Sequence, residues 1–173
     1  PDPLLAQIIP ASTFVEQLKE AQGSLGGSVD DAKIENQNWD VSVKSVAHYP
    51  TVLSMMVENA DWTTSLGQAY VLQPEDVGKS IQRLRAEAMD IGNLETTPQQ
   101  AVTEAGGVIR IEPAQPKLIY VPQYNPETVY VEQPKESGVS TGTAVAVAAI
   151  ACTTGLLIGA WLNNDYDYDG RGI

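Results

Sequence analysis

The chain has 173 residues, of which 43% are hydrophobic, and 22 acidic against 10 basic side chains give it a formal net charge of −12. This length allows one domain of ordinary size with an appended segment. The acidity argues against nucleic acid as a partner, because phosphate binding requires clustered Lys and Arg. A single cysteine, Cys152, excludes an intramolecular disulfide.

The first 37 residues show apolar stripes at helical spacing. A short helical turn over the first residues stops at Pro10. Ser12 or Thr13 is placed to cap a second helix. The glycine-rich residues 23–28 predict a loop, and the mostly polar residues 29–37 predict a short helix. The stripe of the second helix consists of Phe14, Val15, Leu18 and Ala21.

Residues 38–62 hold the only histidine and two of the three tryptophans. Asp40 suits an N-cap and Pro50 suits a first helical turn, so two short helices are predicted here. Asp61 predicts the cap of a further helix. We expect Trp39 and Trp62 to close the two ends of one helical core. The apolar faces of these helices would be formed by Val52, Leu53, Met56 and Val57 and by Leu66, Ala69, Tyr70 and Leu72.

A longer helix is predicted from Pro74 to Gly92. Proline and acidic residues suit its first turn, and glycine suits its end. Arg83 and Arg85 flank its apolar stripe and are expected to face solvent. The stripe consists of Val77, Ile81, Leu84 and Ala88.

From residue 94 the period changes from helical to alternating. Residues 108–112 predict a strand after a Gly-Gly turn, with residues 101–102 as its partner. Residues 117–122 and 128–131 predict two more extended runs, which the surrounding prolines restrict to edge strands or arms. Tyrosines on such an arm suit partner docking, and the alternative is a small β-subdomain packed on the helices. The docking candidates are Tyr120, Tyr124 and Tyr130.

Residues 137–164 contain no charged side chain. A helix needs roughly 20 residues to cross the hydrocarbon core, so residues 139–162 predict a transmembrane helix in contact with the lipid bilayer. The alternative is a buried glycine- and alanine-rich segment. Trp161 would anchor the span at the interface. Small residues favour close packing against a partner helix, and the candidates are Gly142, Ala146, Gly155 and Gly159.

The tail after the span spells D-x-D-x-D-G, the opening of a calcium loop. No later bidentate acid follows Asp165, Asp167 and Asp169, so the sequence favours an acidic, solvated or partner-facing tail, with a calcium site as the alternative. His48 is the only imidazole, which excludes a multi-histidine metal site, and no nucleophile-elbow pattern occurs. The pairs at 30–31 and 75–76 are explained by loop solvation and by helix-start charge. We therefore expect no catalytic residue, no cofactor and no enzyme activity.

Several runs together resemble a known family. They are PDPLLAQII, NWD, DWT and IQRLR in the first 85 residues, GNL with TTPQQ at 92–100, and IEPAQPKLIYVPQYNPETVY at 111–130. The chain is similar over residues 1–131 to the bacterial envelope family called domain of unknown function 3300. The resemblance implies export and a periplasmic domain, and it implies no activity. If the predicted span crosses the inner membrane, the N-terminal domain is expected on its periplasmic side.

These observations predict a mainly α-helical fold with a small bundle of short helices, a short β-rich and extended Pro-Tyr segment, and one C-terminal transmembrane helix. The expected domains are 1–93, 94–136, 137–164 and 165–173. The expected function is a non-enzymatic, membrane-anchored periplasmic accessory subunit that scaffolds integral membrane subunits, for example in a photosynthetic reaction centre or a respiratory assembly. The alternatives are a cell-envelope enzyme or glycan-binding protein with an acidic groove, and a calcium-dependent adhesin.

Overall fold

The computed structural model describes residues 1–115, 118–122, 129–130 and 166–167. The chain divides into two compact units, Pro1–Gln82 and Arg83–Ile173. The division falls inside a helix, whereas the sequence placed the end of the helical domain at residue 93. The described residues confirm a mainly helical chain with a small two-stranded sheet.

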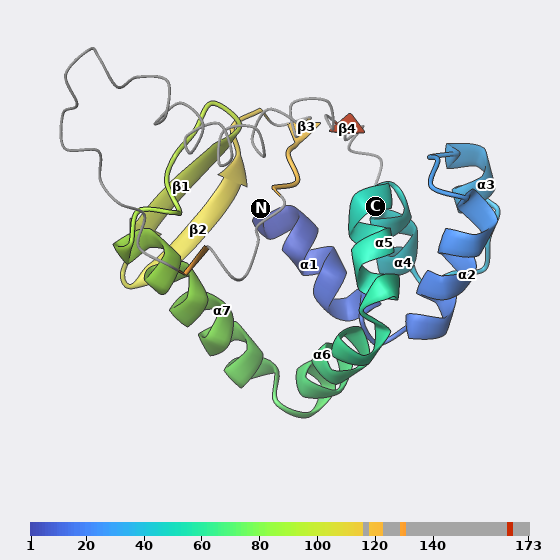
Figure 1. Cartoon of the computed structure of the whole chain (residues 1–173), viewed down its shortest axis with the longest axis horizontal. Coiled ribbons are helices and arrows are strands. Elements are labelled where there is room, and N and C mark those ends of the chain that lie inside the picture. The colour runs from blue at the N-terminus through green and yellow to red at the C-terminus, as the bar shows by residue number, and fades with distance from the viewer. Residues whose placement is uncertain (116–117, 123–128, 131–165, 168–173) are drawn as a thin grey trace, which may run out of the picture. The chain divides into compact units, whose positions relative to one another are not determined.

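The first unit is a bundle of short helices (Figure 1). Helix α1 packs against α4 and α6, and α2 packs against α4 and α5. The fully buried side chains at its centre include Leu18, Ile34, Val43, Val46 and Met56. The helices are α1 (Asp2–Ala11), α2 (Val15–Leu25), α3 (Asp31–Glu35), α4 (Val41–Ala47), α5 (Pro50–Glu58), α6 (Ala60–Leu72) and α7 (Pro74–Asp90), the last of which continues into the second unit.

Local sequence signals set several helix starts as predicted. The Asp40 carboxylate accepts a hydrogen bond of 2.9 Å from the backbone N–H of Ser42 and so caps α4. Pro50 and Pro74 stand at the first positions of α5 and α7. Asp30, which the sequence suggested was only solvated, caps α3 by accepting from the backbone N–H of Lys33.

The α1–α2 region differs from the prediction. Helix α1 includes Pro10, and Ser12 and Thr13 do not cap α2 but donate their hydroxyls backward to carbonyl oxygens of the last turn of α1. Helix α2 continues through Gly23 and ends at Leu25, and its C-cap is Gly26, whose φ of 59° is the left-handed value that favours glycine after a helix. The predicted loop is therefore shorter because the helix has further buried contacts at Leu25.

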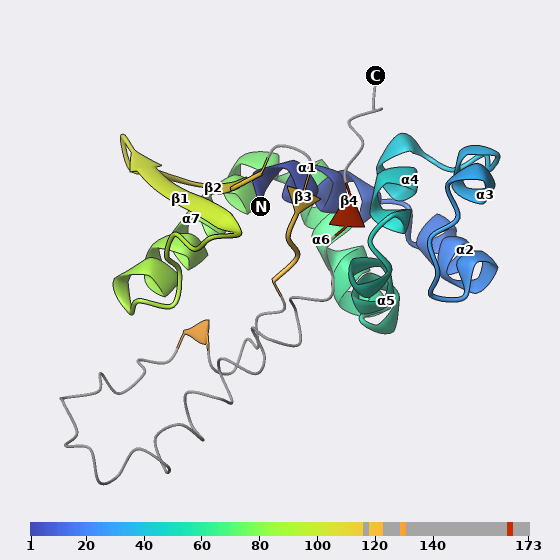
Figure 2. The same cartoon turned by 90° about the horizontal axis from the view of Figure 1, so that it is seen from above.

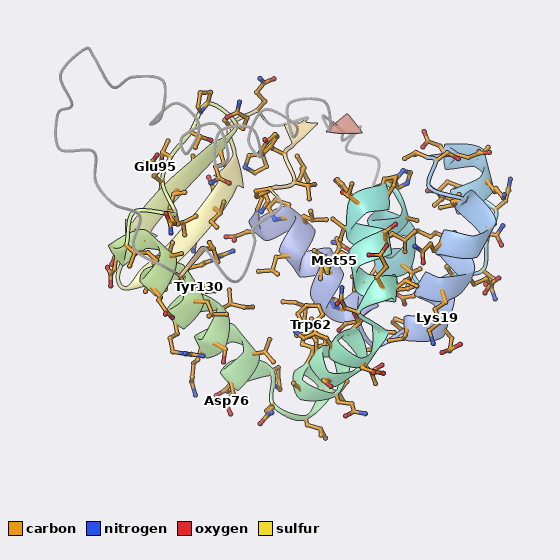
Figure 3. All side chains as sticks on the ribbon, in the orientation of Figure 1. Lys19, Met55, Trp62, Asp76, Glu95 and Tyr130 are labelled. Carbon is orange, nitrogen blue, oxygen red and sulfur yellow. The ribbon has the colours of Figure 1, made fainter. Side chains whose placement is uncertain are left out.

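Helix α6 is buried most deeply at two small residues next to the predicted apolar face, of which Leu66, Ala69 and Tyr70 are partly buried and Leu72 is exposed. It begins at Ala60, one residue before the expected cap Asp61, and its buried residues are Thr63 and Gly67. The Thr63 hydroxyl donates to the carbonyl oxygen of Met56 at 2.7 Å. Trp62 is 52% exposed, while Trp39 is buried. Trp62 therefore does not close the core (Figure 3).

The second unit is built around a β-hairpin that lies beside the C-terminal half of α7 (Figure 2). Strands β1 (Gln100–Ala105) and β2 (Val108–Pro113) pair antiparallel, with Ala105 opposite Val108. Gly106 and Gly107 between them both have positive φ, as a type I′ two-residue hairpin turn requires. The hairpin and its strand assignment are confirmed. Its core consists of Ala88, Leu94, Ile109 and Ile111.

Contacts to α7 explain two further corrections in this unit. Arg85 does not simply face solvent, since its Nη1 donates to the carbonyl oxygen of Ile109 at 2.8 Å. Of the predicted apolar stripe only Ala88 is buried, and Leu84 is 36% exposed. The guanidinium of Arg85 thus joins α7 to the outer edge of β2.

The last described segments are short. Strand β3 (Leu118–Ile119) pairs antiparallel with β4 (Tyr166–Asp167). Val129 and Tyr130 are not part of a strand, contrary to the extended run predicted at 128–131. No helix in the described ranges is long and apolar enough to cross a bilayer. The span predicted at 137–164 lies outside the described residues.

Candidate binding groove

An open groove of about 770 Å³ lies on the first unit between the α1–α2 turn and α6. One wall comes from the turn and the first residues of α2, including Phe14, Val15, Glu16 and Lys19. The other wall is one full face of α6, because its residues recur at helical spacing. They are Ala60, Asp61, Thr64, Gly67, Gln68, Val71 and Leu72.

Gly67 lets the two walls meet. A Cβ at this position would lie 2.5 Å from the carbonyl oxygen of Ser12 and 3.0 Å from the backbone nitrogen of Thr13. Ser12 is itself buried and its hydroxyl donates to the carbonyl oxygen of Ile9. The turn therefore packs directly against the backbone of α6, and this contact forms the base of the groove.

The groove has a markedly apolar end. Val71 is 67% exposed and Leu72 is 81% exposed at the C-terminus of α6. Phe14 and Val15, from the other wall, are each only partly buried. Exposed large apolar side chains that share one concavity are typical of a surface that contacts another molecule.

Most polar groups along the groove are already engaged within the chain. The hydroxyls of Thr13 and Thr64 donate to backbone carbonyl oxygens at 2.8 Å. The Gln17 side-chain oxygen accepts from the backbone N–H of Asp40 at 2.7 Å. Glu16 forms an ion pair with Lys19 at 2.8 Å.

The groups that remain for a ligand are few. Within the described ranges, no side-chain hydrogen bond or ion pair engages the carboxylate of Asp61 or the amide of Gln68. Both residues lie on the groove face of α6 and are exposed. The groove therefore offers apolar contact area with one uncompensated negative charge and one amide.

The predicted docking tyrosines occupy different environments. Tyr120 is 8% exposed, which fits the alternative of a packed segment. Tyr130 is partly buried and packs against the core of the second unit. Asn93 supports this segment, because its Nδ2 donates to the carbonyl oxygen of Val129 at 2.8 Å. Tyr124 lies outside the described residues.

The other predicted site residues are mostly beyond the described ranges. These are the helix-packing candidates Gly142, Ala146, Gly155 and Gly159, the anchor Trp161, and the carboxylates Asp165 and Asp169. Asp167 belongs to β4. Among the described residues, no three His, Cys, Asp or Glu side chains gather as a metal site would require.

His48 lies at the C-terminal end of α4, where it is the C-cap residue. Its Nδ1 lies 3.3 Å from the Asp31 carboxylate of α3, and the imidazole is partly exposed. Asp31 belongs to the acid pair at 30–31, and Asp76 belongs to the acid pair at 75–76. The Asp76 carboxylate forms an ion pair of 3.1 Å with Lys79 in the first turns of α7. Neither pair lines the groove.

Sequence reasoning did not predict the groove. Phe14, Val15 and Leu72 were assigned to buried stripes. One available signal was Gly67, since a glycine inside a helix costs about 1 kcal/mol relative to alanine and therefore suggests a close approach of another segment. That signal does not identify Ser12 as the neighbour.

Comparisons with known proteins support the resemblance seen in the sequence. The model of the family described as "Protein of unknown function (DUF3300)" matches residues 1–161. The Uncharacterized protein YacH of Escherichia coli (strain K12) is 36% identical over 168 residues, covering 75% of this chain. The chain matches only 27% of the length of that relative. No solved structure matches the chain significantly.

Proposed function

Because the chain belongs to the DUF3300 family of proteins of unknown function, we propose a function from its own geometry: it is a non-enzymatic accessory subunit that binds other proteins of the bacterial envelope. The observation that carries this proposal is the open groove with Val71 and Leu72 exposed on one wall. A monomeric surface rarely leaves such side chains together in a concavity without a partner.

The proposed attachment is to the inner membrane, with residues 1–131 on the periplasmic side. What supports it is the uncharged run at 137–164, which is long enough for one helix to cross the hydrocarbon core. The small residues Gly155 and Gly159 would allow close packing against integral membrane subunits of a larger complex.

The experiment is gentle detergent extraction of the full chain from native membranes, followed by sizing and mass spectrometry. Co-migration with one large complex at fixed stoichiometry is the expected result. Replacing Gly155 and Gly159 with Leu should release the chain from the complex while leaving it in the membrane, and the single change Cys152→Ala is the matched control. Migration of the unmodified chain alone would sink the proposal.

Protease treatment of spheroplasts tests the orientation. Added protease should degrade residues 1–131 in intact spheroplasts if this part is periplasmic, and a cytoplasmic marker should survive in the same sample. Protection of residues 1–131 until the membrane is lysed would contradict the proposed location.

A second candidate is a glycan-binding protein or envelope enzyme. It is favoured by two carboxylates, Glu16 and Asp61, that line the same groove. Glycoside hydrolysis generally uses a pair of carboxyl groups, although Glu16 is engaged here by Lys19. Turnover or binding of cell-wall glycan that is lost in Glu16→Gln and Asp61→Asn would favour this candidate over the scaffold.

A further inference from the structure

The groove on the first unit combines a negative charge with exposed apolar side chains, and these two features indicate which kind of molecule it binds. The inference rests on the proposed function as a protein-binding subunit. The carboxylate of Asp61 lies on the same face of α6 as Val71 and Leu72. Residues separated by about three full helical turns lie on the same face of a helix, so the carboxylate and the apolar side chains lie along one side of α6.

The whole unit reinforces the negative charge at the groove. Residues 1–82 contain 11 acidic side chains and 4 lysines. Each of the four ammonium groups has a partner within the unit. Lys19 pairs with Glu16 and Lys79 with Asp76. Lys33 and Lys44 donate to the backbone carbonyl oxygens of Ser24 and Glu35. No positively charged group in this unit is therefore free to compensate Asp61, and an acidic field of this kind attracts cationic partners.

We infer that the groove binds a basic amphipathic peptide segment of a partner protein. Its apolar side chains contact Phe14, Val71 and Leu72. A Lys or Arg about three helical turns away pairs with Asp61, because Asp61 and Leu72 lie near opposite ends of α6. In helix-in-groove recognition, the bound helix places its apolar anchors three or four residues apart on one face. A flanking charge then sets the orientation of the bound segment. The close contact of Gly67 with Ser12 forms the base of the groove in the chain alone, before any segment binds.

The test uses the purified full chain in detergent as bait for a display library of random dodecapeptides. The enriched peptides should combine Lys or Arg with at least two large apolar residues. For a synthetic copy of an enriched peptide, Asp61→Asn should weaken binding about threefold to fivefold, as expected for an exposed ion pair. Leu72→Ser should weaken it about tenfold or more, because an apolar contact is lost.

Two control variants match these changes in type and exposure. Glu75→Gln removes an exposed acid on α7, and Val41→Ser removes a 66% exposed apolar side chain on α4, and neither residue lines the groove. Both should bind the peptide as the unmodified chain does. Raising the salt concentration should weaken binding to the unmodified chain more than to Asp61→Asn, since screening acts on the ion pair.

Three results would overturn the inference. The first is a library that yields no enriched peptide, and the second is enrichment of peptides that lack a cation. The third is that Asp61→Asn and Leu72→Ser both bind the peptide as tightly as the unmodified chain does. The proposed function has an independent readout. If the peptide test fails while the full chain still co-migrates with a membrane complex, the subunit proposal stands and attachment by this groove is rejected.

Discussion

Gly67 of α6 lies so close to Ser12 of the α1–α2 turn that a Cβ would come within 2.5 Å of the Ser12 carbonyl oxygen. Gly67→Ala should therefore lower the free energy of unfolding by about 1 to 2 kcal/mol, because overlap with backbone atoms outweighs the gain in helix propensity. Denaturant unfolding measures this change.

The matched control for that substitution is Gly23→Ala in α2, where nothing lies within 4 Å of the added Cβ. It should raise the free energy of unfolding by about 0.5 to 1 kcal/mol. If both variants raise the free energy of unfolding, the close contact of Gly67 with Ser12 is wrong.

Removal of the cap of α4 should be costly. Asp40→Ala deletes the acceptor of the Ser42 N–H and Oγ–H bonds, which measure 2.9 and 2.6 Å, and should destabilise the unit by about 1 to 2 kcal/mol. Asp40→Asn should retain most of the stability. Asp61→Ala is the control, since Asp61 lies in the first turn of α6 but is not its cap, and its loss should be about 0.5 kcal/mol or less.

Arg85 should hold β2 against α7 in a way that Arg83 does not. Arg85→Ala removes the 2.8 Å bond to the carbonyl oxygen of Ile109 and should speed amide hydrogen exchange in 108–113, corresponding to a loss of about 1 to 2 kcal/mol. Arg83→Ala, which removes an exposed side chain from the same helix, should leave the exchange nearly unchanged. Equal effects of the two substitutions would count against the observed contact.

The hairpin turn should discriminate between side chains at Gly106, whose φ is 61°. Gly106→Asn should be tolerated because asparagine adopts the left-handed region readily, whereas Gly106→Val should cost about 1 to 2 kcal/mol. Exchange rates of amides in β1 and β2 measure the difference. A valine variant as protected as the asparagine variant would show that the turn has another conformation.

The sequence predicted the parts of this fold that depend on neighbouring residues. The cap at Asp40, the prolines that begin α5 and α7, and the Gly-Gly turn of the hairpin each act over a few residues. The family resemblance over residues 1–131 likewise followed from the sequence and is confirmed by the match to residues 1–161.

What the sequence left open depends on contacts between distant residues. Periodicity predicted an apolar face on α6, but packing against other segments made Thr63 and Gly67 its most buried residues. Trp62 and Leu72, which the sequence assigned to the core, are exposed. The same holds for Arg85, whose partner Ile109 lies on another element.

The candidate groove is the clearest case of this division. Sequence alone determined that its two walls contain a helix start near residue 14 and a helix ending near residue 72. Only the tertiary structure brought Ser12 against Gly67, left Asp61 without an ion pair in the described ranges, and aligned it with Leu72. The physical reason is that local propensities act along the chain, whereas a concave surface and its charge arise from packing between segments that are far apart in sequence.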